Sequence, residues 1–371
     1  MKTLSRIVAA SSLVTCAAAQ AGGLYLYEST TSDIGLASAG MAARAQDASI
    51  MQANPAGLAH VAGESFSGSL IGLYGDTVLD TFNGGNAGNV IGLVPMGSAF
   101  YSQQVNDKWT LGVGLYGNYG MSLEYDKLFN KIDIPAATTQ ALTLQPSASY
   151  RINDQWSLGA ALGLQYGMFK LEAQPVGAAS RKKVEDDDVR VNGRVGVLYE
   201  LDNDTRFGLS YSSEVEFEFR DKNVESSSIM PRQVVLSGYH ALNDRLALMG
   251  NINWQDWSAY QTLTPGADTR DTYQIALGTQ YRFNDKMRWN AGFAFDTSMY
   301  DSQSHGDITI PTGKAYRIGM GLDYQLDEIR SLGVAFEAVI LDSSSVTLGN
   351  GAKVAGFSHP ALYFLSMNYN W

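Results

Sequence analysis

From residue 64 onward the chain consists of long runs in which apolar residues alternate with small or polar ones. Between 156 and 168 the even positions carry Trp, Leu, Tyr, Met and one Ala, and the odd positions carry Ser, Gly, Ala and Gln. Successive side chains of a strand point to opposite faces, so each run predicts a strand with one apolar face and one small or polar face. Such strands are typical of a membrane barrel with a wet lumen.

Short turns rich in Asn and Asp join these runs and recur about every 40 to 50 residues, which indicates an internal repeat. A soluble β-propeller has a similar period, but its strands are short, and an inner face of Gly, Ser, Gln and Arg would make a poor soluble core. We therefore predict an all-β fold, a transmembrane antiparallel β-barrel of about fourteen strands. The predicted strands are 64–75, 90–104, 108–121, 139–151, 155–172, 187–201, 204–220, 231–242, 244–257, 272–283, 286–299, 315–326, 329–342 and 359–371. The predicted outer connections are 76–89, 122–138, 173–186, 221–230, 258–271, 300–314 and 343–358.

The first residues have the pattern of a secretory signal peptide. Lys2 and Arg6 flank the start of an apolar stretch, and Ala19-Gln20-Ala21 matches an A-x-A cleavage pattern, so we predict removal of residues 1–21. The one cysteine of the chain, Cys16, lies in this leader, which leaves the mature chain without thiol chemistry. The stretch LVTC also approaches a lipoprotein signal, although its Thr stands where a smaller residue is normal. Export agrees with a location in the outer membrane of a Gram-negative cell.

Charge and motif spacing exclude several other classes. The chain has 26 Lys and Arg against 37 Asp and Glu, and this acidic balance argues against nucleic acid as a partner. GVGLYG at 112–117 matches a dinucleotide-binding motif, but it lies inside an alternating strand with no helix after it. The four histidines lack metal-ligand spacing, so we expect no metal, no cofactor and no enzymatic activity. RKKVEDDD at 181–188 is interpreted as a solvated outer loop, with a divalent cation or lipopolysaccharide at the rim as the alternative.

Residues 22–62 lack sustained alternation and are rich in Ala, Ser and Gly. Asp47 is a suitable cap for a short helix that runs through Gln52. Pro55 then forces Asn54 out of the helical region, and the chain must become extended there. A compact, kinked segment of this kind can fill a lumen, so we predict a hatch of short helices at 22–62 and a barrel at 63–371.

Longer stretches are more specific than any single motif. They include GLASAGMAARAQDASIMQANPA at 35–56, GNYG at 117–120, PSASYRINDQWSLGAAL at 146–162, GVLYELDNDTRFGLSYSSEVEFEF at 196–219, NWQDWSAY at 253–260 and YQIALGTQYRFNDKMRWNAGFAFD at 273–296. In these stretches, and over nearly the whole mature chain, the sequence resembles the FadL-type long-chain fatty acid transporters of the Gram-negative outer membrane. That family also includes aromatic-hydrocarbon transporters.

The resemblance implies a fourteen-stranded barrel with a hatch in its lumen, and passive uptake of long-chain fatty acids or other hydrophobic compounds. The Asn-Pro-Ala motif, Asn54, Pro55 and Ala56, would form the hatch gate. The third strand would be kinked at Asn118, Tyr119 and Gly120 and leave a lateral gap in the wall, and strand glycines are consistent with a bend. The final strand, LYFLSMNYNW, resembles the signal read by the outer-membrane assembly machinery, and we expect a monomer surrounded by outer membrane lipid.

The hydrophobic ligand would be captured by the outer loops and then enter the barrel. Fatty-acid-transporting members carry a basic residue where LEAQP stands at 171–175, and Arg270 matches a second basic residue poorly, so fatty acid and aromatic hydrocarbon both stay open. A general porin and a surface receptor or adhesin are the alternatives. The candidate ligand-binding residues are Leu123, Leu128, Phe129, Ile132, Ile134, Phe169, Leu362 and Phe364, with Val176 in the capturing loop.

Overall fold

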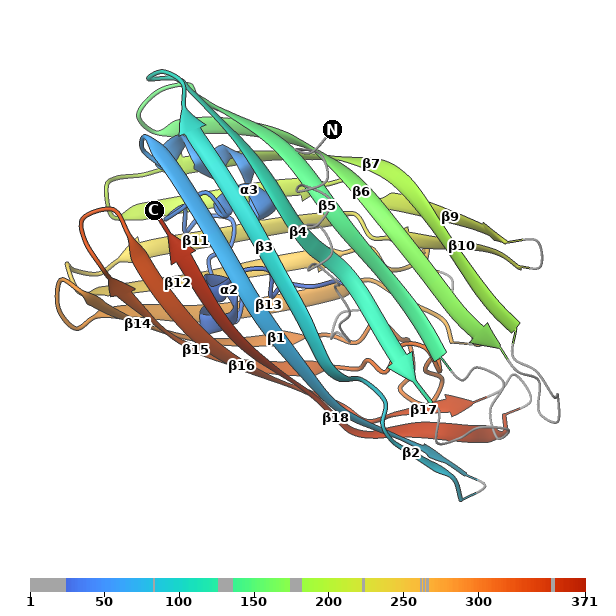
Figure 1. Cartoon of the computed structure of the whole chain (residues 1–371). Helices are drawn as coiled ribbons and strands as arrows, with labels where there is room; N and C mark the ends of the chain where they lie inside the picture. The colour runs from blue at the N-terminus through green and yellow to red at the C-terminus, as the bar shows by residue number, and fades with distance from the viewer. Residues whose placement is uncertain are drawn as a thin grey trace, which may run out of the picture.

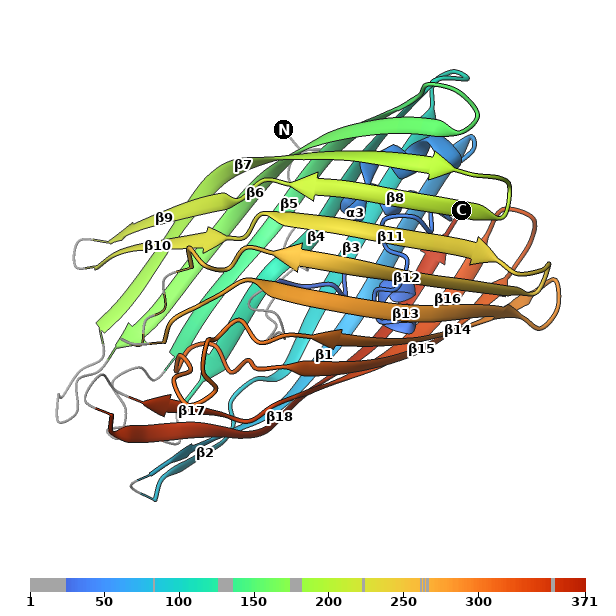
Figure 2. The ribbon, with the colours of Figure 1, turned by 180° about the vertical axis from the view of Figure 1, so that it is seen from behind.

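The computed structural model describes residues 25–82, 84–125, 136–173, 182–221, 224–260, 262, 264, 267–347 and 351–371. Its main sheet has sixteen strands; β2 and β17 stand at the two ends of the strand order, and the other fourteen close into a ring because β1 pairs with β18 (Figures 1 and 2). The predicted fourteen-stranded antiparallel barrel is therefore confirmed.

The strands of the ring follow one another in chain order. They are β1 (Glu64–Thr81), β3 (Gly92–Gln104), β4 (Trp109–Glu124), β5 (Ala136–Arg151), β6 (Trp156–Ala173), β7 (Lys182–Glu200), β8 (Thr205–Ser212), β11 (Gln233–Ala241), β12 (Leu246–Gln255), β13 (Thr272–Arg282), β14 (Met287–Asp296), β15 (Ala315–Gln325), β16 (Ser331–Leu341) and β18 (Lys353–Asn370). The short strands outside the ring are β2 (Asn86–Asn89), β9 (Val215–Asp221), β10 (Val224–Met230) and β17 (Ser344–Thr347).

The short turns lie at one end of the barrel, together with its first and last strand residues. In the turn before β6, the side chain of Asn153 accepts hydrogen bonds from the backbone of Gln155 at 2.9 Å and of Trp156 at 2.8 Å. Asn is suited to this place because its side chain mimics a backbone turn. At the same end, Phe66 N donates to Trp371 O at 2.6 Å and joins the two barrel termini. We refer to this end as the periplasmic end and to the other as the outer end.

Several predicted boundaries at the outer end were wrong. The predicted strand 204–220 is broken after Ser212, and β9 pairs with β10 in a sheet of its own. The predicted connections 76–89, 173–186, 221–230 and 343–358 contain strand residues of β1, β2, β7, β10, β17 and β18. The charged stretch from Lys182 to Asp188 belongs to β7 and is not a loop. Strands that rise above the membrane contact water on both faces, so they lose the apolar alternation that marks the rest of the wall.

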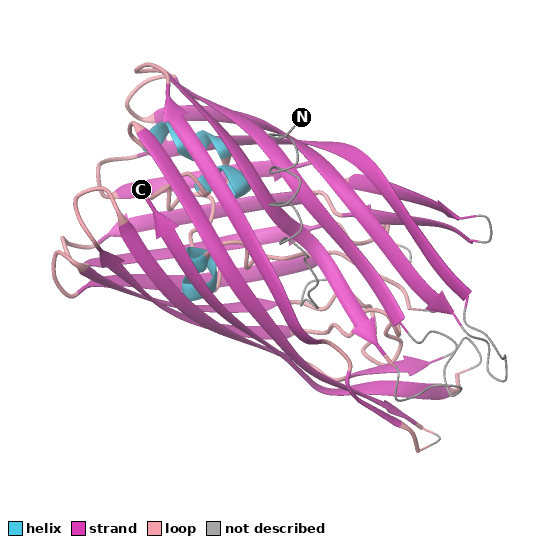
Figure 3. Ribbon diagram, viewed as in Figure 1, coloured by secondary structure: helices cyan, strands magenta, loops and turns pink. Residues whose placement is uncertain are grey.

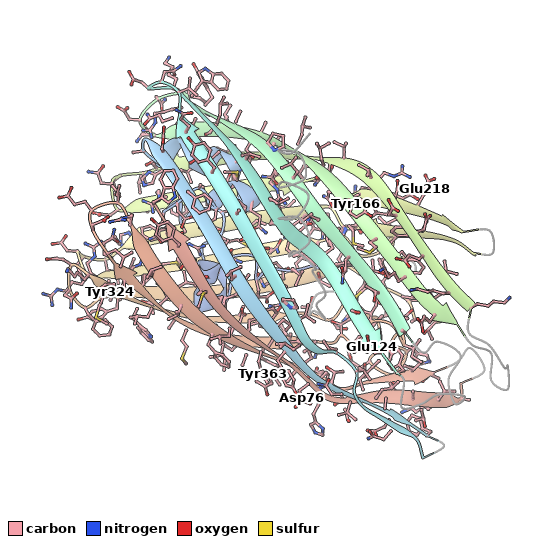
Figure 4. All side chains as sticks on the ribbon, viewed as in Figure 1. Asp76, Glu124, Tyr166, Glu218, Tyr324 and Tyr363 are labelled. Carbon is pink, nitrogen blue, oxygen red and sulfur yellow. The ribbon has the colours of Figure 1, made fainter. Side chains whose placement is uncertain are left out.

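Within the membrane-facing wall, the predicted side-chain alternation is present. Leu158, Ile275 and Met320 are exposed on the outer surface, whereas Gln165 is buried on the inner side. Outward side chains stand off the strands along the whole wall, and Tyr166 and Tyr324 mark two such positions in Figure 4. The outer surface is therefore apolar and the inner surface polar, as a bilayer and a lumen require.

Residues 25–62, which we call the hatch segment, lie inside the ring (Figures 1 and 3). They contain α2 (Thr31–Leu36), α3 (Ile50–Ala53) and the 3₁₀ helix η2 (Pro55–His60). Ser49 occupies the cap position of α3, while Asp47 accepts a hydrogen bond from Ser49 N at 2.8 Å, so the predicted capping residue was wrong. Across the described residues, every helix is too short or too polar to cross a membrane.

Candidate functional site

The Asn-Pro-Ala motif rests on three glycines of the barrel wall. A Cβ atom at Gly159 of β6 would lie 2.1 Å from Ala56 N, and one at Gly208 of β8 would lie 1.9 Å from Ala42 O. Between them, a Cβ at Gly196 of β7 would lie 2.0 Å from the side-chain oxygen of Asn54. These distances leave no room for any side chain, so the three glycines form a cradle that admits the hatch backbone.

The side-chain amide of Asn54 bonds both within the hatch segment and to the cradle strand β7. Its Nδ2 donates to Ala42 O at 2.8 Å and to Val197 O at 3.0 Å, and its Oδ1 accepts a hydrogen bond from Ala56 N at 3.1 Å. The residue is fully buried and extended, with φ −146° and ψ 100°, as expected for a residue before proline. Buried amides are stable only when hydrogen-bonded, so this fit ties the motif to the wall.

Wall side chains also satisfy the carbonyl groups of the hatch segment. Ser149 Oγ donates to Ala56 O at 3.0 Å, and Gln145 Nε2 donates to Met51 O at 2.6 Å. Arg206 donates from Nε to Ala43 O at 3.1 Å and from Nη2 to Arg44 O at 2.8 Å. These donors satisfy carbonyl groups in and between the short helices that lack a backbone partner, so wall side chains hold the hatch segment in the lumen.

A second anchor holds the beginning of the hatch segment on the opposite wall. Arg317 of β15 is fully buried and forms ion pairs with Glu28, with Asp296 at 2.6 Å, and with Glu337 at 3.8 Å. We call these four residues the Arg317 cluster. One guanidinium faces three carboxyl groups, and Glu28 alone among these acids comes from the hatch segment.

Tyr27 covers the Arg317 cluster from the hatch side. Its ring centre lies 5.0 Å from the Arg317 guanidinium carbon, and its hydroxyl oxygen accepts a hydrogen bond from Asn253 Nδ2 at 2.9 Å. Burial raises the pKa of the Tyr27 hydroxyl well above its usual value, and the nearby charge of Asp296 raises it further. Tyr27 therefore stays neutral and contributes a cation–π contact to the anchor.

The third strand of the ring, β4, is irregular at Asn118, Tyr119 and Gly120. Its ladder with β3 runs from Gln104↔Thr110 to Ser98↔Tyr116, and in the described part no pairing with β3 follows. Its register with β5 shifts between Gly117 and Tyr119, which makes Asn118 a bulge residue. From Tyr116 to Met121 every residue is buried, unlike the alternating pattern before it. The strand thus stops pairing with β3 at this irregularity.

The hatch segment bonds to β4 at this irregularity. Leu26 N donates to Asn118 O at 2.9 Å, and Tyr25 forms an isolated antiparallel bridge with Tyr119. Ser29 Oγ donates to Gly117 O at 3.2 Å, while Ser98 Oγ of β3 donates to Ser29 O at 2.6 Å. Residues 25–29 therefore take the place of β3 as the partner of β4 and contact both sides of the strand separation.

Four of the candidate ligand residues lie in one apolar cluster toward the outer end. Leu123, Phe169, Leu362 and Phe364 are buried in it, together with Tyr25, Leu26 and Tyr27 of the hatch segment. Leu128, Phe129, Ile132, Ile134 and Val176 lie outside the described residues. Six aromatic members of the cluster outside the hatch segment were not predicted from the sequence, and these are Tyr125, Phe217, Phe219, Trp257, Tyr300 and Phe357. Phe217 and Phe219 alternate with acidic residues in a stretch interpreted as plain wall, so the pattern gave no sign of their role.

The amino-acid sequence matches the family described as outer membrane protein transport protein (OMPP1/FadL/TodX) over residues 12–371. The chain belongs to this family. Outer membrane protein P1 of Haemophilus influenzae is 25% identical to this FadL-type chain, and the match covers 98% of each protein. The long-chain fatty acid transport protein of Escherichia coli O6:H1 is also 25% identical, over 100% of this chain and 98% of that protein.

Solved structures agree with the FadL-type fold. A Pseudomonas aeruginosa FadL homologue has a TM-score of 0.82 at 18% identity, covering 94% of this chain and 99% of that one. The toluene transporter TodX of P. putida has a TM-score of 0.71 at 16% identity, covering 93% and 98%. The predicted outer membrane location is confirmed by the family, whose members include fatty acid and aromatic hydrocarbon transporters. No group of three or more His, Cys, Asp or Glu within the described ranges is arranged to hold a metal ion.

Proposed function

We propose that this FadL-type chain mediates passive, hatch-gated uptake of hydrophobic molecules across the outer membrane, with release through the side of the barrel. The observation that carries the proposal is that residues 25–29 lie in the lumen and also pair with β4 where β4 leaves β3. Displacement of this segment would free β4 at the wall and, together with a rearrangement around Asn54-Pro55-Ala56, open a path through the lumen. The driving force would be the concentration gradient of the ligand.

Contacts in the outer apolar cluster suggest how a ligand would start this movement. Tyr25 and Tyr27 share that cluster with Phe169 and Phe364, so an entering apolar molecule would compete for the same side chains. Burial of apolar surface contributes about 25 cal/mol per Å². A ligand that covers these side chains could therefore replace the contacts that the hatch segment loses.

Deletion of Asn118 tests the lateral step. Removing the bulge residue would restore a continuous register between β4 and β5 and let β4 straighten toward β3. We expect a folded barrel that no longer delivers a fluorescent hydrocarbon or fatty acid probe into the bilayer of proteoliposomes. Asn118→Gly, which keeps the bulge, is the matched control and should transport at the parent rate. Transport by the deletion variant at that rate would contradict release through the wall.

Asn54→Ala tests the gate. The substitution leaves Ala42 O and Ala56 N without their buried side-chain partner and removes one hydrogen bond from Val197 O, and each unpaired buried group costs about 1–3 kcal/mol. We expect intermittent leak currents in planar bilayers from a barrel that is otherwise intact. Asn192→Ala is the control. Asn192 is a buried amide like Asn54, but it belongs to the wall and donates its hydrogen bond to Ser212, another wall residue. A large steady current through the parent protein would favour a general porin over a gated transporter.

The substrate class is tested separately by extracting the purified barrel and identifying its bound molecules by mass spectrometry. The relatives' names include both long-chain fatty acids and toluene. Arg270 is the basic residue that could hold a carboxylate near the outer end. Its Nε lies 3.9 Å from Asp301 Oδ1 and donates a hydrogen bond to Ser298 O at 3.3 Å. If the parent barrel retains fatty acid and the Arg270→Gln variant does not, carboxylate recognition is assigned to Arg270. If the parent barrel retains a neutral hydrocarbon instead, no carboxylate-binding residue is required.

A further inference from the structure

A groove of about 720 Å³ lies on the outer, bilayer-facing surface of the barrel and crosses strands β4 to β8 and β11. Small side chains create it. Ala148 of β5 is paired with Ala160 of β6, which is paired in turn with Val195 of β7. The next position in this row is Tyr211 of β8, a large side chain that stands beside the depression.

The groove lies directly behind the Asn-Pro-Ala motif. Gly159 and Gly196 line it from the outside, and the same two glycines belong to the cradle on the inside. Because neither residue has a side chain, the wall here is one backbone layer thick. An occupant of the groove would thus be separated from Pro55 and Asn54 by peptide groups alone.

The chemistry of the groove is that of a phospholipid site. Its lining is apolar and belongs to the exposed outer surface, where Leu158 and Val195 would face acyl chains. At its periplasmic end lie Trp109 and Tyr150, whose ring centres are 4.8 Å apart, and such aromatic pairs are typical of the membrane interface. The ammonium of Lys108 lies 5.8 Å from the Tyr150 ring centre. Since this aromatic pair marks the membrane interface, the Lys108 side chain can extend to a lipid phosphate group there.

We propose that the groove binds one acyl chain of a phospholipid from the periplasmic leaflet, with the phosphate near Lys108, and that this lipid stabilises the docked Asn-Pro-Ala motif. The acyl chain fills the depression left by Ala148 and Ala160 and supports the wall backbone at Gly159 and Gly196. This inference does not depend on any step of the proposed uptake.

The test uses the full-length barrel in detergent with added palmitoyl-oleoyl phosphatidylglycerol, and native mass spectrometry counts retained lipid. Ala160→Leu fills the groove. The larger side chain would exclude about two methylene groups of the acyl chain from the groove, which would weaken lipid retention about tenfold. Ala291→Leu is the matched control, because Ala291 is an outward-facing alanine of β14 between exposed Trp289 and Phe293. Lys108→Gln should weaken retention of this lipid but leave retention of a neutral diacylglycerol unchanged.

Hydrogen exchange of the hatch amides, measured with and without the lipid, reads the coupling. We expect slower exchange at residues 54–57 when lipid is bound to the parent barrel and to Ala291→Leu, and no such slowing in Ala160→Leu. Equal lipid retention by both alanine variants would overturn the site, as would a retained hydrocarbon ligand or a dimer mass in place of phospholipid. Lipid binding without any change in hatch exchange would overturn the coupling.

Discussion

Arg317→Met is expected to detach the beginning of the hatch segment from the wall and leave the barrel open. Arg317 is fully buried and faces Glu28, Asp296 and Glu337. Met keeps much of the side-chain length but carries no charge, so three carboxyl groups would share a dry site without this cation. Removal of one partner from a buried ion pair destabilises by about 3–5 kcal/mol.

This destabilisation should displace the hatch segment, because Glu28 is the acid of the cluster that can move, whereas the other two acids are fixed in the ring. Asp296 and Glu337 belong to β14 and β16, whose ladders hold them on both sides, whereas Glu28 can move into the lumen. We expect steady currents in planar bilayers and faster hydrogen exchange at residues 25–30. Arg288→Met is the control, because Arg288 pairs with the wall residue Asp323 at 3.0 Å and its side chain is 31% exposed. A closed barrel with slow exchange at 25–30 would rule out Arg317 as the anchor.

The same cluster distinguishes a lost charge from lost packing. Adding Glu28→Gln, Asp296→Asn and Glu337→Gln to Arg317→Met removes all three acids together with their cation. Replacement of all members of a buried ionic group is often nearly neutral, whereas removal of one member is not. We therefore expect the quadruple variant to recover most of the closure that Arg317→Met loses. If the quadruple variant conducts as strongly as the single one, the packing of the Arg317 side chain matters more than its charge.

Much of the wall could be predicted from the sequence because a bilayer and a lumen impose a period of two on every spanning strand. The extended conformation of Asn54 was equally accessible, since it depends on the proline that follows. Both features arise from neighbours in the chain. The sequence also placed the bulge region at Asn118 through family resemblance, although nothing in its local pattern specifies what the freed backbone pairs with.

Features that depend on distant residues could not be predicted. Glu28 and Arg317 are 289 positions apart, and the hatch segment has no periodicity that would align its acids with the wall. The break between Ser212 and Val215 was missed because the alternation continues across it, and Phe217 fits against Gly167, where a Cβ would lie 2.5 Å from its ring. In the sequence, Gly159, Gly196 and Gly208 look like other small residues of the inner face, so their role as a cradle emerged only with the position of the hatch.

That cradle gives the second large expected effect. The double substitution Gly159→Ala with Gly208→Ala would place one methyl carbon 2.1 Å from Ala56 N and another 1.9 Å from Ala42 O. Both contacts are with backbone, which cannot rotate away as a flexible side chain could. Overpacking of this kind costs about 1–3 kcal/mol per site. The two sites together cost about 2–6 kcal/mol, and because about 1.4 kcal/mol is a tenfold change in an equilibrium, the undocked hatch fraction should rise by at least about thirtyfold.

Gly193→Ala is the matched control for the cradle, since it lies in the same strand as Gly196 but a Cβ there meets no atom within 4 Å. We expect the double variant to conduct and the control to stay closed, with both retaining the heat-modifiable electrophoretic mobility of a folded barrel. A folded but closed double variant would show that the hatch can shift without opening a path. The cradle would then serve to position the motif and not to hold the lumen shut, and the Arg317 cluster would remain as the main restraint on opening.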